Sequence, residues 1–166
     1  MRDDSKKWAP SYPENAQGVT DLTIEPAPIE RLTFVSGPRD AALEISQCGC
    51  AYSWPEAATD ARHALSLRRD RILVVNGPEI EDGWHDAQAL AVSDATHALT
   101  GFDLWGSDVI GVLNRISEID PSRPSRSCEV MFGGIPVILY KIAGSGRFRL
   151  FVAPANVAGL IGYLNV

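Results

Sequence analysis

Hydrophobic and polar positions follow two patterns along the second half of the chain, one typical of helices and one typical of strands. An apolar run at 98–105 precedes a segment at 107–119 whose apolar residues recur at helical spacing. After a polar turn come two runs rich in β-branched and aromatic residues, at 129–142 and 148–152. A last amphipathic segment opens at Pro154, and proline suits the first turn of a helix. This order predicts a strand, a helix, strand-forming runs and a closing helix.

The first half repeats this order in weaker form. Its predicted elements are a strand at 29–35, a helix at 41–48, a hairpin of 63–67 and 71–75, and a helix at 79–90. The segment at 51–62 reads mostly as connection. Acidic residues at positions 79, 81 and 82 favour a helix start there, because carboxylates stabilise the first turn of a helix.

One stretch aligns between the halves without a gap. Arg71–Pro78 in the first half matches Arg147–Pro154 in the second. Each is a β-rich run that leads into proline at an expected helix start. We therefore predict an α+β fold of two pseudo-repeated β-α-β-β-α units, 29–90 and 91–166, that share a core. A chance match of pattern is the alternative. Each unit has too few strands to bury both faces of its sheet, so any face left over needs cover from a partner.

Residues 1–28 are polar and rich in proline, so we predict an extended or disordered N-terminal arm outside a domain at 29–166. Two interpretations of this arm stay open. It is either a free tail or a segment that wraps a partner. In the second case Trp8 and Tyr12 are its candidate anchors, because aromatic side chains give a large contact area.

The composition narrows the functional classes. With 45% hydrophobic and 22% charged residues among 166, the sequence is typical of a soluble globular protein. A net charge of −6 argues against nucleic-acid binding, which needs clustered Lys and Arg. No apolar run approaches the roughly 18 residues of a membrane span, and the N-terminus lacks the apolar core of a signal peptide. We therefore expect a cytoplasmic protein that binds no membrane.

No catalytic motif stands out. The three histidines, His63, His85 and His97, are scattered and have no serine or cysteine in a nucleophile context nearby. The G-S-G at 144–146 lies between two strands and reads as a hairpin loop, and the G-G at 133–134 marks a bend or a second hairpin turn. The sequence therefore predicts no catalytic residue and no bound cofactor in this chain.

The cysteines form an odd set of Cys48, Cys50 and Cys128, with no histidine at ligand spacing. A metal site at the C-G-C would need at least two more ligands from elsewhere. Reduced, partly buried thiols are the simpler interpretation. We predict no metal site.

A basic turn is the most unusual polar feature of this acidic chain. Arg123 and Arg126 follow Asp120-Pro121. Guanidinium groups match carboxylates and phosphates, so the turn is either a clamp for such a group or a solvated loop. We predict a partner contact at both arginines. The tryptophans, Trp8, Trp54, Trp84 and Trp105, are further candidate anchors, although core packing explains any one of them equally well.

Four short motifs in the second half occur in the order of one known family. They are Ser93-Asp94-Ala95-Thr96, Gly106-Ser107-Asp108, Ile119-Asp120-Pro121 and the R-F-R-L-F-V-A-P at 147–154. From residue 91 onward the chain resembles the gamma subunit of heterotetrameric sarcosine oxidase. That family is in turn similar to the folate-binding part of aminomethyltransferases, so the resemblance implies a truncated version of that domain.

The resemblance implies a non-catalytic, accessory role in a flavin-dependent complex that oxidatively demethylates a small methylated amine. The partners would be alpha-, beta- and delta-type subunits, chiefly the large alpha subunit. FAD, FMN, NAD, tetrahydrofolate and zinc would lie on those other subunits. Thr96 stands where the family usually has Ser, so sarcosine, dimethylglycine and methylglutamate all stay open as substrates. The alternative is a stand-alone folate-binding or aminomethyltransferase-related protein.

Overall fold

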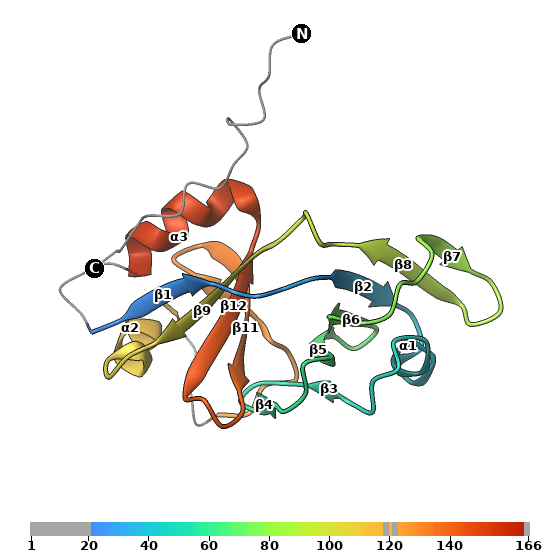
Figure 1. The fold of residues 1–166 in the computed structure, drawn as a ribbon, viewed down its shortest axis with the longest axis horizontal. Coiled ribbons are helices and arrows are strands. Elements are labelled where there is room, and N and C mark those ends of the chain that lie inside the picture. The colour runs from blue at the N-terminus through green and yellow to red at the C-terminus, as the bar shows by residue number, and fades with distance from the viewer. Residues whose placement is uncertain (1–20, 118–119, 121–122, 165–166) are drawn as a thin grey trace, which may run out of the picture.

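The computed structural model describes residues 21–117, 120 and 123–164, and its strands form two sheets (Figure 1). Sheet A has the order β1 (Thr23–Pro26), β9 (Thr100–Trp105), β12 (Arg147–Val152), β11 (Ile135–Ile142) and β10 (Glu129–Phe132), with β4 (Ala57–Ala58) also on β11. Sheet B has the order β3 (Ala51–Tyr52), β5 (His63–Arg68), β6 (Arg71–Val75), β2 (Leu32–Ser36), β8 (Leu90–Asp94) and β7 (Gly83–His85).

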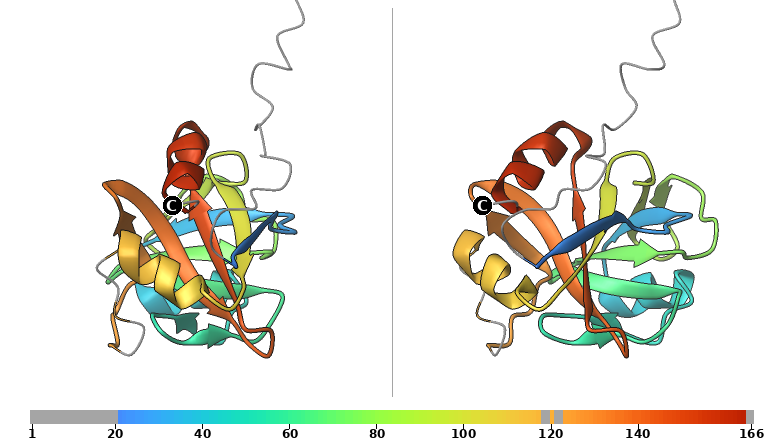
Figure 2. Two further views of the ribbon diagram at one scale, coloured as in Figure 1. Left: turned by 90° about the vertical axis from the view of Figure 1, so that its left-hand side faces the viewer. Right: turned by 60° about the vertical axis from the view of Figure 1, so that its left-hand side comes forward.

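The helices lie outside the two sheets. A short 3-10 helix, η2 (Pro154–Asn156), leads into α3 (Val157–Leu164), which packs with α2 (Val109–Ile116) on sheet A, while α1 (Arg39–Ile45) packs on sheet B (Figure 2). Separate apolar clusters fill the space between the helices and sheet A, between the two sheets, and between sheet B and α1. The layers therefore run helix, sheet, sheet, helix.

The alternation of side chains along β12 shows why these layers form. Phe148, Leu150 and Val152 pack in the cluster under α2 and α3, whereas Phe151 packs in the cluster between the sheets. Successive side chains of a strand point to opposite faces, so one strand serves both layers.

Several sequence predictions are confirmed. The hairpin at 63–75 is β5–β6, the segment at 107–119 contains α2, and the closing helix follows Pro154. The run at 129–142 is itself a hairpin, β10–β11, whose turn is Gly133-Gly134 with φ values of 53° and 88°. Positive φ at both central residues matches the twist of the paired strands, and glycine adopts it without strain.

The helix predicted over 79–90 is wrong. Gly83 has a φ of 121°, which no α-helix contains, and it begins β7. Leu90 belongs to β8, where it and Val92 are buried against α1 with the period of two of a strand. The acidic start seen in the sequence lies in a loop after Pro78.

The hairpins of the two sheets sit in the same way beside an earlier strand. In sheet A, β12 of the hairpin β11–β12 pairs antiparallel with β9, and in sheet B, β6 of the hairpin β5–β6 pairs antiparallel with β2. Residues 23–26 of the predicted arm form β1 on the outer side of β9, while the domain boundary after residue 28 stays a prediction. The predicted α+β class is confirmed as a mixed, sheet-rich fold, whereas the division into two pseudo-repeated units stays a prediction. No helix among the described residues is long and apolar enough to cross a bilayer.

Candidate functional site

An open groove of about 820 Å³ lies beside the predicted basic turn. Its walls come from the end of α2 at Arg115–Ser117, from the hairpin β10–β11 and from the turn that carries Arg123. Met131, 54% exposed on the edge strand β10, is a large hydrophobic side chain of its lining. The groove thus combines backbone of a sheet edge, apolar side chains that include Ile116, Val130 and Met131, and two guanidinium groups.

Trp54 holds the basic turn in place. Its ring is 3% exposed and stacks on Phe148 with ring centroids 6.0 Å apart. The indole Nε1 donates to the carbonyl oxygen of Asp120 at 3.2 Å, and the Trp54 carbonyl accepts from the Ser125 amide at 2.8 Å. Trp54 is therefore part of the core and also a positioning residue of the groove.

The charges of the groove are only partly neutralised within the fold. Arg115 lies 3.5 Å from Asp108, and Glu129 lies 3.5 Å from Arg68. The exposed Arg123 side chain has no hydrogen bond or ion pair to another described residue. Within the part of the chain that the structure describes, this guanidinium is available to an approaching carboxylate.

The predicted partner-contact residues do not all meet at this groove. Arg123 lines it, whereas Arg126 is exposed outside it and contributes its carbonyl oxygen to the hydroxyl of Ser66 at 2.9 Å. Trp8 and Tyr12 lie outside the described residues.

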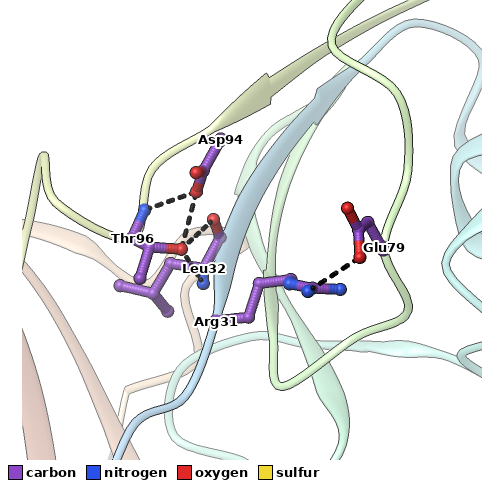
Figure 3. A network of polar contacts seen from close by, with 5 residues as sticks. All are labelled: Arg31, Leu32, Glu79, Asp94 and Thr96. Atoms are coloured by element: carbon purple, nitrogen blue, oxygen red, sulfur yellow. Dashed lines mark hydrogen bonds and ion pairs between the residues drawn. The ribbon is translucent and has the colours of Figure 1, made fainter.

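The Ser93-Asp94-Ala95-Thr96 motif ends β8 where the chain crosses from sheet B to sheet A (Figure 3). Asp94 Oδ1 accepts hydrogen bonds from the Thr96 amide at 2.8 Å and from the Thr96 hydroxyl at 2.6 Å, and these bonds lower the pKa of the Asp94 carboxyl. The Leu32 amide donates to Thr96 Oγ1 at 3.1 Å, and the Ala95 amide donates to the Leu32 carbonyl at 2.8 Å. The motif joins β8 to β2, and threonine supplies the hydroxyl that serine would.

The histidines occupy three different environments. His63 is 5% exposed, donates from Nδ1 to the Asp60 carbonyl at 2.7 Å, and burial lowers its pKa. His85 donates from Nε2 to the Glu81 carbonyl at 2.8 Å, and His97 is exposed. The structure brings none of the three together.

The cysteines stay unpaired thiols among the described residues. Burial raises the pKa of Cys48, and it raises that of the fully buried Cys128 to about 12, whereas Cys50 is exposed. A raised thiol pKa disfavours the reactive thiolate. In the part of the chain that the structure describes, no three His, Cys, Asp or Glu side chains gather as a metal site would require.

A buried polar row between the sheets was missed by the sequence analysis. Asp103, Arg149 and Tyr140 sit opposite one another on β9, β12 and β11. Arg149 donates to Asp103 from Nε at 2.5 Å and from a terminal nitrogen at 2.8 Å, in the two-pronged geometry of a strong ion pair. His63 of sheet B lies 5.2 Å from Tyr140, centroid to centroid. The signal was present, because arginines alternate with apolar residues in R-F-R-L-F-V.

Comparison with solved structures identifies the fold. The chain superposes on a chain of the heterotetrameric sarcosine oxidase from Corynebacterium sp. U-96, solved in complex with pyrrole 2-carboxylate, with a TM-score of 0.68 and 14% identity, over 90% of this chain and 85% of that one. Glycine cleavage system aminomethyltransferase T from Bartonella henselae gives a TM-score of 0.50 and 11% identity, over 87% of this chain and 45% of that one.

These similarities are seen in the structure and not in the sequence. The sequence matches no protein-family model and no curated protein. The chain spans less than half the length of the aminomethyltransferase, as the 45% coverage states. What the two structures share with this chain is a mixed, sheet-rich fold common to sarcosine oxidase and aminomethyltransferase chains.

Proposed function

We propose that this chain is a non-catalytic accessory subunit of a multi-subunit, flavin-dependent amine oxidoreductase, in the manner of a sarcosine oxidase gamma subunit. The observation that carries the proposal is the fold match to a chain of a heterotetrameric enzyme, which extends over 90% of this chain and 85% of that one. A match over most of both lengths favours a chain of similar extent and similar place in an assembly.

The bonding of titratable side chains within the fold supports a structural role. Asp103 is paired with Arg149, the Asp94 carboxyl is occupied by Thr96, and His63 is buried with its Nδ1 bonded to the backbone. Groups that bond within the fold stabilise it and are not poised for proton transfer to a substrate. We therefore place the amine chemistry, with FAD, FMN, NAD, tetrahydrofolate and zinc, on alpha-, beta- and delta-type partner subunits.

The proposed assembly uses the groove and its basic turn as one contact with the large subunit. Arg123 would pair with a carboxylate of the partner, Arg126 would extend that contact, and Trp8 and Tyr12 would anchor the N-terminal arm. The pseudo-repeat belongs to the same proposal: unit 29–90 would supply most strands of sheet B and unit 91–166 most strands of sheet A, while β4 and most of β8 lie in the sheet of the other unit.

Co-expression tests this function. The full chain would be produced with the flavoprotein subunits encoded beside it, and a stoichiometric complex is expected on size-exclusion chromatography with absorbance near the flavin bands. Arg123→Glu should weaken the complex, because it reverses the charge of this exposed guanidinium, while Arg69→Glu at an exposed position in the β5–β6 turn is the matched control. A chain that remains a free, stable monomer in the presence of those subunits would contradict the proposal.

A second candidate is a stand-alone folate-binding protein, favoured by the likeness to aminomethyltransferase T. It predicts that the purified chain alone binds tetrahydrofolate, which isothermal titration calorimetry measures directly. Heat of binding at one site per chain would support it over the accessory role.

A further inference from the structure

Trp84 is the most exposed large hydrophobic side chain of the described residues, at 63%. The other two described tryptophans are covered: Trp54 is core, and Arg147 stacks on Trp105 with its guanidinium carbon 3.9 Å from the ring centroid. The Trp84 indole Nε1 donates to Asp86 Oδ1 at 2.7 Å, and this bond favours one orientation of the ring in the isolated chain. A pre-oriented aromatic side chain loses little entropy on docking.

The register of the hairpin β7–β8 gives the face on which Trp84 lies. Trp84 is opposite Ala91, and Leu90 and Val92 on either side of Ala91 are buried against α1. Side chains alternate along a strand, so Trp84, Ala91 and Ser93 share the face turned away from α1. All three are exposed. The hairpin lies at the end of the molecule remote from α2 and α3 (Figure 1).

The hairpin β7–β8 offers an outer strand edge and, on the face opposite Trp84, an acidic hollow. β7 is the last strand of sheet B, so its outer side offers backbone groups to an added strand in the part of the chain that the structure describes. The loop 79–82 before β7 and the end of β8 line a hollow of about 540 Å³, whose carboxylates are those of Glu79, Glu81, Asp82 and Asp94. Asp94 alternates with Ser93, so this hollow lies on the other face of the sheet from Trp84. Of these carboxylates, Glu79 pairs with Arg31 at 3.3 Å, and Arg31 is the one cation among the residues lining the hollow.

We infer that the β7–β8 hairpin docks an extended, lysine- or arginine-bearing segment of a partner protein. The segment adds as a strand along β7, and its side chains alternate between the two faces. An apolar side chain covers Trp84 on one face, and cations on the other face reach the carboxylates of the hollow. Charge selects this occupant over a second copy of the chain, because two such hairpins would bring like charges together at the shared edge. In one respect the inference rests on the proposed function: the segment belongs to a larger subunit of the same complex.

The first arm of the test uses the reconstituted complex of the full chain with its flavoprotein subunits. Trp84→Ala should weaken assembly by about tenfold or more, as tryptophan hot spots do. The double variant Glu81→Gln with Asp82→Asn should weaken it less and flatten its salt dependence. Ile110→Ala, which removes a 39% exposed side chain from α2, is the matched control and should assemble as the wild type.

The second arm needs no partner subunit. A fluorescein-labelled peptide of alternating lysine and threonine is titrated into the chain alone and followed by polarisation, with an alternating glutamate and threonine peptide as control. The wild type should bind the lysine peptide in preference, and Trp84→Ala should bind it at least tenfold more weakly. Unchanged circular dichroism of Trp84→Ala confirms that the variant folds.

The two arms separate the possible failures. If no complex forms but the lysine peptide binds through Trp84, the proposed function fails and the docking surface stands. If the complex forms with Trp84→Ala as tightly as with the wild type, the inference is overturned and the function stands. Equal binding of the two peptides, binding of neither, or self-association of the wild type through Trp84 also overturns the inference.

Discussion

Sheets A and B differ in the segment that follows two otherwise similar strands, β12 in sheet A and β6 in sheet B. Arg147 on β12 stacks on Trp105 of the neighbouring strand at 3.9 Å, and Arg71 on β6 stacks on Phe34 at 4.2 Å. Each strand then leads to a proline within three residues. Beyond β12 the chain coils back over its sheet as α3, whereas beyond β6 it runs to the exposed hairpin β7–β8 (Figure 1).

Apolar spacing and one asparagine account for the difference. In α3, the buried residues Val157, Leu160, Ile161 and Leu164 recur at helical spacing. After Pro78 the chain offers Glu79, Ile80, Glu81 and Asp82 before Gly83, so no such stripe exists. Asn76 adopts a φ of 51°, and its Oδ1 accepts from the Glu30 amide at 3.0 Å, which ties the chain to the start of β2. Proline permits a helix start, but the apolar stripe forms the helix.

The largest expected loss of stability comes from breaking the buried ion pair of Arg149 and Asp103, which lies on the face of sheet A turned toward sheet B. Arg149→Met leaves the Asp103 carboxylate, 7% exposed, without its partner. Removing one member of a buried pair costs about 3–5 kcal/mol, because the remaining charge is desolvated and uncompensated. The free energy of unfolding from urea titration measures this loss.

The double variant Arg149→Met with Asp103→Leu is the control for that experiment. It removes both charges and should recover much of the lost stability. A single variant as stable as the wild type would show that solvent reaches Asp103, and that the two sheets are not sealed at this row.

A helix-covered and an open sheet should respond differently to truncation. Leu160→Ala in α3 removes a fully buried side chain and should cost about 2–5 kcal/mol, whereas Trp84→Ala on the open hairpin should change stability by no more than about 0.5 kcal/mol. Urea midpoints of the two variants measure the contrast. Equal losses would mean that Trp84 also stabilises the isolated fold.

The parts of the fold that were predictable are those where local pattern and burial agree. The hairpin β5–β6, the helix α2 and the turn at Gly133-Gly134 each follow from residues close in sequence. The hairpin β7–β8 was not predictable in this way, because Leu90 and Val92 become strand residues only by burial against α1, which lies more than 40 residues earlier. Sheet order likewise depends on distant pairing.

The polar residues show the same division. Arg123 was predictable as an exposed cation of a turn, but its neighbours in the groove come from α2 and β10. Trp84 was one of four equivalent tryptophans in the sequence, and only the register with Ala91 shows that it stays uncovered. The sequence showed which residue types could make contacts, whereas the fold was needed to choose among the candidate residues.

A smaller loss of stability is expected at acidic pH, and it comes from His63, the residue that sheet B contributes beside the polar row. Burial lowers the pKa of His63, so the unfolded chain binds its proton more readily than the folded protein. The stability that neutral His63 contributes is complete above the unfolded pKa of about 6.5 and is lost as the pH falls below it. Between about pH 8 and pH 5, the wild type should lose more unfolding free energy than His63→Gln. His97→Gln, at an exposed position, should follow the wild-type curve.

The smallest effect should come from the crossing between the two sheets. Thr96→Val removes the hydroxyl that accepts from the Leu32 amide and donates to Asp94, and should cost about 1 kcal/mol as the net value of such bonds. Thr96→Ser keeps the hydroxyl, so its free energy of unfolding should lie within a few tenths of a kcal/mol of the wild-type value. This is about the resolution of urea titration. Because the loss of the hydroxyl removes the larger of the two Thr96 bonds that lower the Asp94 pKa, Thr96→Val should shift that pKa part of the way back toward its ordinary value in a carbon-13 NMR titration. An unshifted Asp94 in Thr96→Val would mean that the Thr96 amide alone holds the carboxylate, and that the hydroxyl serves β2 and not the motif.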